Sequence, residues 1–279
     1  MKLLQLLALV SFVPGALLAQ TPDLDRTRAD ILAEGLALFR SESASWVATD
    51  LLLAQKPDLE AVAGYVTYAD GDTTRTVFFE QPAGGALLAR HRFGFGPADI
   101  SPLTARQLPS RPASAREARL FQLRQRVELE LTTQKLDGEP YTFPANTRPN
   151  LAFVERPEEV RVYVLTGPQE GNVLPIGNDF LFTFDAGGQL RRAERLHRSY
   201  LALQPPPDQP TVQASLHTHL PAHPHITATD ICSMLLYRDA FPAPQHVVLG
   251  PKYVSVFDVP GRKLTILTKK EFERTYKKR

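Results

Sequence analysis

The apolar residues of this chain follow two kinds of periodicity, which dominate different parts of the sequence. Apolar residues recur at helical spacing over residues 27–56 and 114–136, where Ser114 is a candidate N-cap. The segment "AVAGYVTYADGDTTRTVFFEQ" alternates on both sides of Gly71, which predicts a β-hairpin. From residue 158 onward, short β-branched and aromatic runs separated by glycine turns predict a series of strands. The pattern predicts an α+β fold, with N-terminal helices and a hairpin followed by a mixed β-sheet.

The segments between these elements refine the predicted organisation. "GALLARHRF" is expected to form a third strand, residues 97–113 a proline-punctuated loop, and "DICSMLLYRDAF" a short helix. We expect a helical and hairpin region over residues 20–150 and a strand-rich region over residues 151–279. Both regions are expected to pack as one compact unit, since the chain has the length of one large domain or two small ones.

The composition excludes few classes of function, but its net charge and its single cysteine limit the possible ligands and covalent bonds. The 279 residues are 43% hydrophobic and 22% charged, which is typical of a globular protein. A formal net charge of +2 gives no indication of nucleic-acid binding. Cys232 is the only cysteine, so an intramolecular disulfide is excluded, and its apolar surroundings predict a buried core thiol.

The N-terminal segment "MKLLQLLALVSFVPGALLAQ" has the layout of a secretory signal peptide. One lysine precedes an apolar run, and small residues stand before a cleavage point after Ala19. The uninterrupted run is shorter than the roughly 20 residues that a membrane span needs, so no stable membrane insertion is expected once the signal is removed. We therefore expect residues 1–19 to be a signal peptide and the mature protein to be periplasmic or extracellular, of Gram-negative bacterial type.

Candidate chemistry is concentrated in "SLHTHLPAHPHITATDICSMLLY", residues 215–237. On a strand, residues i and i+2 point to the same face, so His217 and His219 would present two imidazoles side by side. Asp230 stands at the start of the short predicted helix and could supply a third ligand. Two imidazoles, a carboxylate and a water would make an open zinc site of the catalytic type.

The spacing of these residues resembles the metal motif of the JAMM (JAB1/MPN) metalloproteases. His217-x-His219, seven residues, and Thr227-x-x-Asp230 match the family's order. The resemblance implies a strand-loop-helix-strand core, on an α/β fold related to cytidine deaminases. It also implies zinc held by His217, His219 and Asp230, and hydrolysis of a peptide or other amide substrate. Thr227 stands where the family has a serine that helps to stabilise the developing oxyanion, and Leu220 stands where it normally has proline.

The family's general base is a glutamate near the start of an early strand of the same domain. The segment "VERPEEVRVYVLTG" offers Glu155, Glu158 and Glu159 in that position, and no local pattern chooses among them. Glu159 directly precedes the predicted strand, so we take it as the candidate catalytic base.

Two further interpretations remain open. Thr-x-x-Asp before an apolar run is also what the N-terminus of a helix requires, with no metal involved. His223 and His225, in a loop braced by prolines, could cover the site or close it as a fourth ligand. The alternative to an enzyme is therefore an exported binding or envelope protein that keeps the fold, with or without a structural metal. His197 is expected on a strand as a sheet residue that could approach the site.

Overall fold

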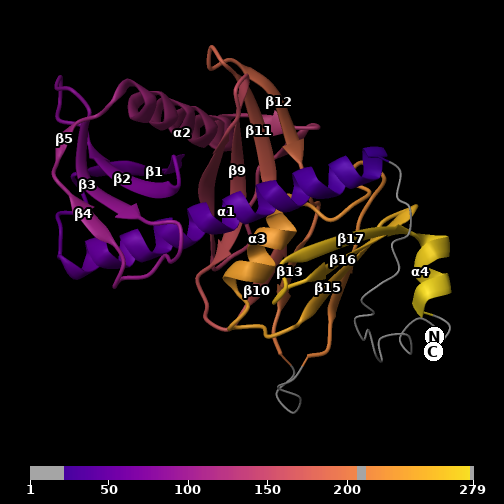
Figure 1. Ribbon diagram of the computed structural model, residues 1–279. Helices are drawn as coiled ribbons and strands as arrows, with labels where there is room; N and C mark the ends of the chain where they lie inside the picture. Colours follow the sequence, from indigo (N-terminus) through magenta and orange to yellow (C-terminus); the bar gives the residue numbers. More distant parts are fainter. Residues whose placement is uncertain (1–21, 206–211, 277–279) are drawn as a thin grey trace. The chain divides into compact units, whose positions relative to one another are not determined.

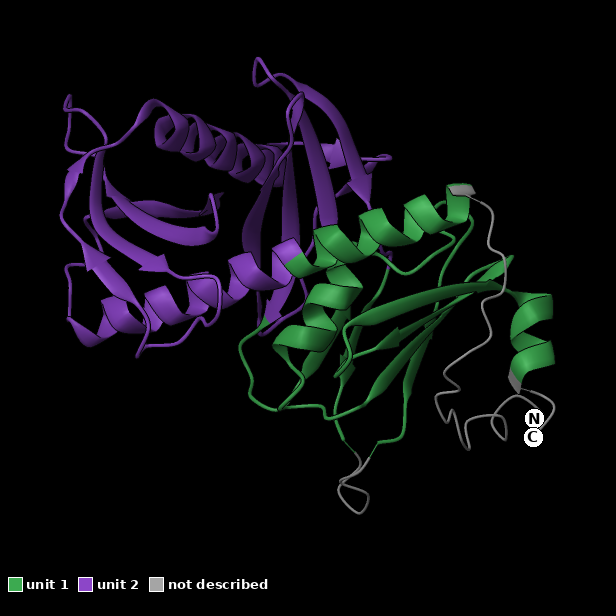
Figure 2. Cartoon of the chain, viewed as in Figure 1, with its two compact units in different colours: residues 1–36, 168–177, 199–279 green, residues 37–167, 178–198 purple. Residues whose placement is uncertain are grey.

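The computed structural model describes residues 22–205 and 212–276, so the expected signal peptide, residues 1–19, lies outside the described part. The chain forms two compact units, each built from separate segments (Figure 2). Unit 1 comprises Met1–Leu36, Pro168–Gly177 and Ser199–Arg279; unit 2 comprises Ala37–Gly167 and Asn178–Arg198. The units interleave along the chain, whereas the sequence suggested a boundary near residue 150.

One long helix, α1 (Pro22–Ala54; Figure 1), contributes to both units, because its residues up to Leu36 belong to unit 1 and the rest to unit 2 (Figure 2). It covers the predicted helical stretch 27–56 as a single helix up to Ala54. Within unit 1, Gly35 lets α1 approach Ile231 of the helix α3 (Ala228–Leu236) closely, since a Cβ atom on residue 35 would lie 2.7 Å from the Ile231 side chain.

Unit 2 begins with an antiparallel sheet in the order β1-β2-β3-β4, with β5 also paired to β3. Its strands are β1 (Val62–Asp70), β2 (Thr73–Glu80), β3 (Leu88–Phe95), β4 (Arg106–Leu108) and β5 (Arg111–Pro112). The predicted hairpin and third strand are confirmed, and Gly71 takes the positive φ of 63° that the tight turn requires. The proline-punctuated stretch 97–113 is not all loop, because β4 and β5 pair with the outer edge of β3.

The second sheet of unit 2 has the order β12-β11-β9-β8. Its strands are β8 (Thr147–Glu155), β9 (Glu159–Pro168), β11 (Phe180–Asp185) and β12 (Leu190–Arg195), and a small hairpin, β6 (Lys135–Leu136) and β7 (Glu139–Pro140), precedes them. Helix α2 (Ala115–Thr133) packs Leu120, Phe121, Leu123 and Val127 into the core formed with these strands. Each such side chain contributes about 1.5–3 kcal/mol through burial.

Unit 1 holds the remaining elements around a mixed sheet in the order β14-β15-β16-β17. These elements are β10 (Leu174–Gly177), β13 (Tyr200–Leu203), β14 (Ser215–Thr218), α3 (Ala228–Leu236), β15 (Gln245–Leu249), β16 (Tyr253–Asp258), β17 (Lys263–Thr268) and α4 (Lys269–Tyr276). β14 pairs with β15 in parallel, and the other neighbours are antiparallel. Separate helices with mixed and antiparallel sheets confirm the α+β class.

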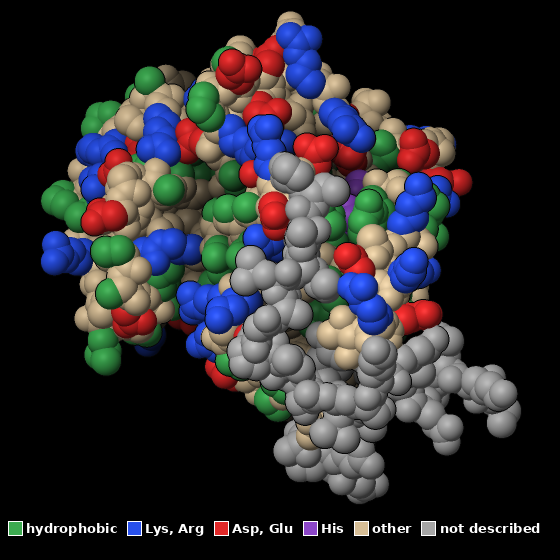
Figure 3. Space-filling view, turned by 45° about the vertical axis from the view of Figure 1, so that its right-hand side comes forward, with side chains coloured by type: hydrophobic (Ala, Val, Ile, Leu, Met, Phe, Trp, Pro, Cys, Tyr) green, Lys and Arg blue, Asp and Glu red, His purple; other side chains and the backbone are tan. Residues whose placement is uncertain are grey.

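The surface gives no sign of a single dominant charge on the face drawn in Figure 3. Lys and Arg side chains alternate there with Asp and Glu, and histidine is visible only as a small patch. Among the described residues, no helix combines the length and apolar character needed to cross a membrane.

Candidate metal centre

The candidate centre lies in unit 1, where β14, helix α3 and β15 form a strand-loop-helix-strand unit with parallel strands. His217 lies on β14, and its side chain is buried, while those of Leu216 and Thr218 on either side are exposed. The backbone N–H of His219 donates to Leu249 O at 3.0 Å, which continues the ladder past the end of β14. His217 and His219 therefore share one face, as the i, i+2 spacing predicts.

Helix α3 places the acidic residue of the motif through a capping box. Thr227 is the N-cap, its Oγ1 accepts from the backbone N–H of Asp230 at 3.3 Å, and Asp230 Oδ2 accepts from the backbone N–H of Thr227 at 2.8 Å. Thr227 Oγ1–H also donates to Oδ2 at 2.8 Å. These bonds hold the carboxylate at the first turn, where the positive end of the helix dipole stabilises a negative charge.

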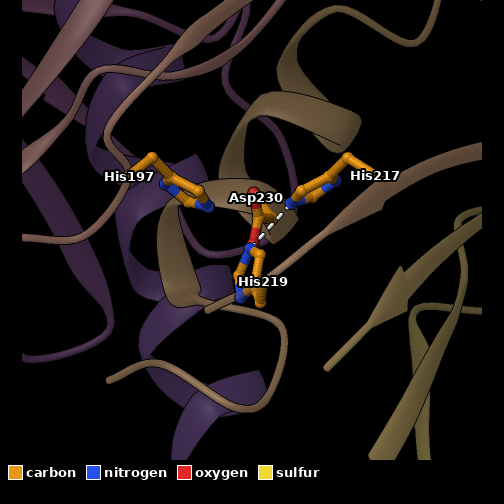
Figure 4. Close-up of side chains that lie close together, drawn as sticks. All are labelled: His197, His217, His219 and Asp230. Atoms are coloured by element: carbon orange, nitrogen blue, oxygen red, sulfur yellow. Dashed lines mark hydrogen bonds and ion pairs between the residues drawn. The ribbon is translucent and has the colours of Figure 1, made fainter. Parts of the chain in front are cut away.

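The two imidazoles and the carboxylate converge. His217 Nε2 lies 2.7 Å from His219 Nε2, and these two nitrogens lie 3.5 Å from Asp230 Oδ1 and Oδ2, respectively. The side chains of His217, His219 and Asp230 are only 5%, 2% and 1% exposed. The ligand atoms of these three residues of unit 1 all lie within 4.8 Å of one another, and Figure 4 shows their side chains pointing toward one another.

The loop between β14 and α3 determines which nitrogen of His219 faces this group. His219 Nδ1 lies 3.0 Å from the carbonyl oxygen of His223 and 2.7 Å from that of His225. Carbonyl oxygens only accept hydrogen bonds, so Nδ1 carries the ring proton, and the Nε2 lone pair of a neutral His219 faces Asp230 and His217.

The two loop histidines thus act on His219 through their backbone. The ring of His225 lies against Tyr253, with centroids 4.6 Å apart. Burial, and to a smaller extent the neighbouring His219, lowers the pKa of His225 below its ordinary value, which favours the neutral ring. Gly250 permits the loop to lie this close, because a Cβ atom there would stand 1.9 Å from the carbonyl oxygen of Pro224.

Ring nitrogens and carboxylate oxygens pointing at one another repel unless a cation lies between them. A proton on one imidazole is the simplest such cation, and a metal ion is the other. Two neutral imidazoles and one carboxylate are a donor set that zinc takes in proteins. The residues present in unit 1 therefore fit a zinc ion.

His197 belongs to unit 2, two residues before the chain enters unit 1 at Ser199. The sequence predicted a strand position, but His197 follows the end of β12 and precedes β13. Its Nδ1 lies 2.6 Å from Asp179 Oδ1, and both side chains are buried. A carboxylate against Nδ1 is the kind of contact that orients a histidine whose Nε2 binds a ligand.

The candidate bases lie in unit 2, around the turn between β8 and β9. Glu159 accepts a hydrogen bond from Arg161 Nε at 2.7 Å, and Glu155 pairs with Arg116 at 2.6 Å. Glu158 is exposed. The metal-binding residues His217, His219 and Asp230 belong to unit 1, and the assignment of Glu159 as base stays a prediction.

Two residues beside the centre had no predicted role. His246 on β15 is fully buried, and its Nε2 lies 2.9 Å from His217 Nδ1. Ser215 lies opposite it on β14 and contacts its Nδ1 at 2.7 Å. No local pattern could have identified either residue, because their proximity depends on the parallel pairing of two strands some thirty residues apart. Cys232 is buried in α3, as expected.

No family model matches the chain, and no curated protein or solved structure matches it either. The resemblance to the JAMM metalloproteases accordingly rests on the motif residues and their spacing. What the structure of unit 1 establishes is a cluster of two histidines and one aspartate, His217, His219 and Asp230, that is able to hold a metal ion.

Proposed function

We propose that this chain is a zinc-dependent hydrolase of amide bonds, with His217, His219 and Asp230 as the zinc ligands. The observation that supports this proposal is the convergence of two imidazole nitrogens and a carboxylate at the carboxyl end of β14 and the N-terminus of α3. A zinc ion bound there supplies the Lewis acidity that lowers the pKa of water to about 7.

The chain's own residues hold this arrangement before any substrate arrives. The loop carbonyls orient His219, and the capping box orients Asp230. In the proposed reaction Thr227 helps to stabilise the oxyanion, and Glu159 removes the proton from the attacking water. Thr227 Oγ1–H donates to the carboxylate of Asp230, so the oxyanion role requires that its hydroxyl turn away from that oxygen.

A structural metal in a protein without catalytic activity is the second candidate. It is favoured by burial, since the three side chains in unit 1 are at most 5% exposed. A closed site with four protein ligands is typical of structural zinc, whereas a catalytic site keeps one position open.

Elemental analysis of the purified full chain tests the metal. We expect near-stoichiometric zinc in the wild type and almost none in His217→Ala and Asp230→Ala. His91→Ala is the matched control, because His91 lies on β3 in unit 2, and it should keep its zinc. A wild-type protein that takes up no divalent metal after dialysis against zinc and cobalt would refute the proposal.

A second experiment separates the two candidates. An open site in the cobalt-substituted protein exchanges its water, so added azide or hydroxamate should change the visible absorption spectrum. A closed structural site should show no change. With an open site, hydrolysis of a library of amide substrates should fall by about 100-fold or more in Glu159→Gln with metal content unchanged.

We also propose that the protein is exported, on the basis of the signal-like segment 1–19. Expressed with its own N-terminus in a Gram-negative host, the protein should accumulate in the periplasm with Gln20 as its first residue. Cytoplasmic protein that retains Met1 would contradict this proposal.

A further inference from the structure

We propose that His246 and Ser215 are positioning residues that set the tautomer and orientation of His217 for metal binding. This inference rests on the proposed zinc site and adds the residues that prepare one of its ligands. All of the residues involved belong to unit 1.

The three side chains form a buried line of hydrogen bonds across two paired strands. Ser215 Oγ lies 2.7 Å from His246 Nδ1, and His246 Nε2 lies 2.9 Å from His217 Nδ1. Ser215, His217 and His246 are 6%, 6% and 0% exposed. Buried polar groups left without partners destabilise a folded protein, so this line of hydrogen bonds satisfies three polar side chains that the sheet buries.

Met234, at the far end of the line, favours one direction for these hydrogen bonds. Ser215 Oγ–H donates to Met234 Sδ at 3.9 Å, and a thioether sulfur can only accept. The lone pairs of Ser215 Oγ are then available to accept from Nδ1–H of His246. A neutral His246 with its proton on Nδ1 presents the Nε2 lone pair to His217.

In the proposed line His217 donates its Nδ1–H to His246, which leaves the Nε2 lone pair of a neutral ring facing His219 and Asp230. This is the tautomer that a metal ligand needs at Nε2. The loop carbonyls impose the same tautomer on His219. Two independent parts of unit 1 thus prepare the two imidazoles, and this agreement is unexpected for histidines that only fill a core.

Substitution of His246 tests the inference in the full chain. His246→Leu introduces an apolar side chain of similar bulk and removes both ring nitrogens. We expect its zinc affinity, measured by competition with a chromophoric chelator, to fall about 10–100-fold, the usual cost of removing such a partner. His246→Gln offers an amide oxygen to His217 and should recover most of the loss.

Two further measurements separate positioning from general destabilisation. The cobalt absorption spectrum should change in His246→Leu and return toward the wild-type spectrum in His246→Gln. If His246→Leu does not fold, Ser215→Ala takes its place, with a smaller expected loss of zinc affinity. Wild-type affinity and an unchanged spectrum in the folded variant would overturn the inference while leaving the zinc site intact.

The tautomers can be read without metal, which separates this inference from the proposed function. Long-range ¹H–¹⁵N correlation spectra of the metal-free wild type should show Nδ1–H on both His217 and His246. A proton on Nε2 of either ring would overturn the proposed line of hydrogen bonds. If the wild type binds neither zinc nor cobalt, the proposed function and the positioning role both fail, and the spectra then decide only the direction of the hydrogen bonds.

Discussion

Helices α2 and α3 begin with the same local structure, but the acidic residue at the start of each helix has different neighbours. Ser114 and Glu117 form a capping box at the start of α2, as Thr227 and Asp230 do at the start of α3. Both carboxylates are buried, with residue exposures of 0% for Glu117 and 1% for Asp230. The local sequence alone does not distinguish them.

The neighbours of the two carboxylates differ. Glu117 accepts from Arg111 at 2.7 and 2.8 Å and from the Tyr68 hydroxyl at 2.8 Å. Burial acts to raise the pKa of Glu117, but the bonds from Arg111, Ser114 and Tyr68 outweigh it and lower the pKa to about 2. The chain thus supplies a cation and donors for this carboxylate.

Asp230 faces two imidazoles instead of an arginine. In their neutral state these rings present lone pairs, so they supply no positive charge to the carboxylate. The comparison shows that a capping box places a carboxylate, and that the groups around it decide which chemistry the carboxylate can take part in. A third box, Thr268 with Glu271 at the start of α4, confirms how general the local pattern is.

The largest expected difference concerns zinc. Zinc at about 1,000 times its dissociation constant should stabilise the wild type against unfolding by about 4 kcal/mol, because the folded state alone holds the site. Glu117→Gln should keep this increment and Asp230→Asn should lose it. Urea unfolding in zinc buffer and in chelator measures both. An equal zinc increment in Asp230→Asn and the wild type would show that Asp230 is no ligand.

The second prediction concerns the structural carboxylate. Glu117→Gln should lower the free energy of unfolding by about 3 kcal/mol, since it leaves Arg111 without its buried partner. Because the folded-state pKa is lowered, the contribution of Glu117 is fully present above pH 4.5 and is lost as pH falls toward about 2. The stability gap between wild type and variant should therefore narrow in acid, and a gap that widened below pH 4.5 would contradict this assignment.

Glu42 sharpens the comparison, because it is a buried carboxylate in unit 2 outside any capping box. Burial raises its pKa from 4.5 to about 7, and Arg124 offsets only part of this effect. At about 1.4 kcal/mol per pKa unit, ionising Glu42 in the folded state costs about 3 kcal/mol.

The sign follows from the raised pKa. The contribution of Glu42 is fully present below pH 4.5 and is lost as pH rises through about 7. Glu42→Gln cannot ionise, so its stability relative to wild type should increase by up to about 3 kcal/mol between pH 4.5 and pH 8. Guanidinium unfolding across this range measures the change, and parallel pH profiles for the two proteins would rule it out.

The loop that orients His219 has no counterpart at α2. Substitution of Gly250, which lies against this loop, tests whether the loop holds His219 in place. Gly250→Ala places a Cβ atom against the carbonyl oxygen of Pro224 and should cost about 2 kcal/mol through overpacking. It should also weaken zinc binding, because the carbonyls of His223 and His225 must move with the loop. Gly171→Ala is the control, since nothing lies within 4 Å of its Cβ position. Unchanged zinc affinity in a folded Gly250→Ala would show that the loop does not orient His219.

Part of the candidate metal centre could be predicted from the sequence, and part of it could not. The strand spacing of His217 and His219 and the helix start at Thr227 follow from local periodicity and cap chemistry, and the structure confirms both. The contacts of His246 and the loop carbonyls depend on strand pairing and on the path of the backbone. Neither leaves a pattern in the residues themselves.

Individual helices and strands of the fold were also predictable from local sequence patterns, whereas their grouping into two units was not. Alternation and turn residues predicted the hairpin around Gly71, and apolar spacing with Ser114 predicted α2. The interleaving of the two units was not predictable, because it depends on contacts between distant segments such as Pro168–Gly177 and Ser199–Arg279. Periodicity describes each element by itself, whereas the assignment of elements to a core is a property of the whole chain.

The smallest expected effect comes from removing the N-cap side chains of the two capping boxes, and it compares the boxes most directly. Ser114→Ala and Thr227→Ala each remove one N-cap side chain and should each cost about 1 kcal/mol of stability. Only Thr227→Ala should also weaken zinc binding, by about tenfold, because Thr227 Oγ1 holds Asp230 Oδ2 at 2.8 Å. Thr227→Ser keeps the hydroxyl and should behave as wild type in both measurements. Equal zinc affinity in the two alanine variants would mean that the cap at α3 serves only its helix, as the cap at α2 does.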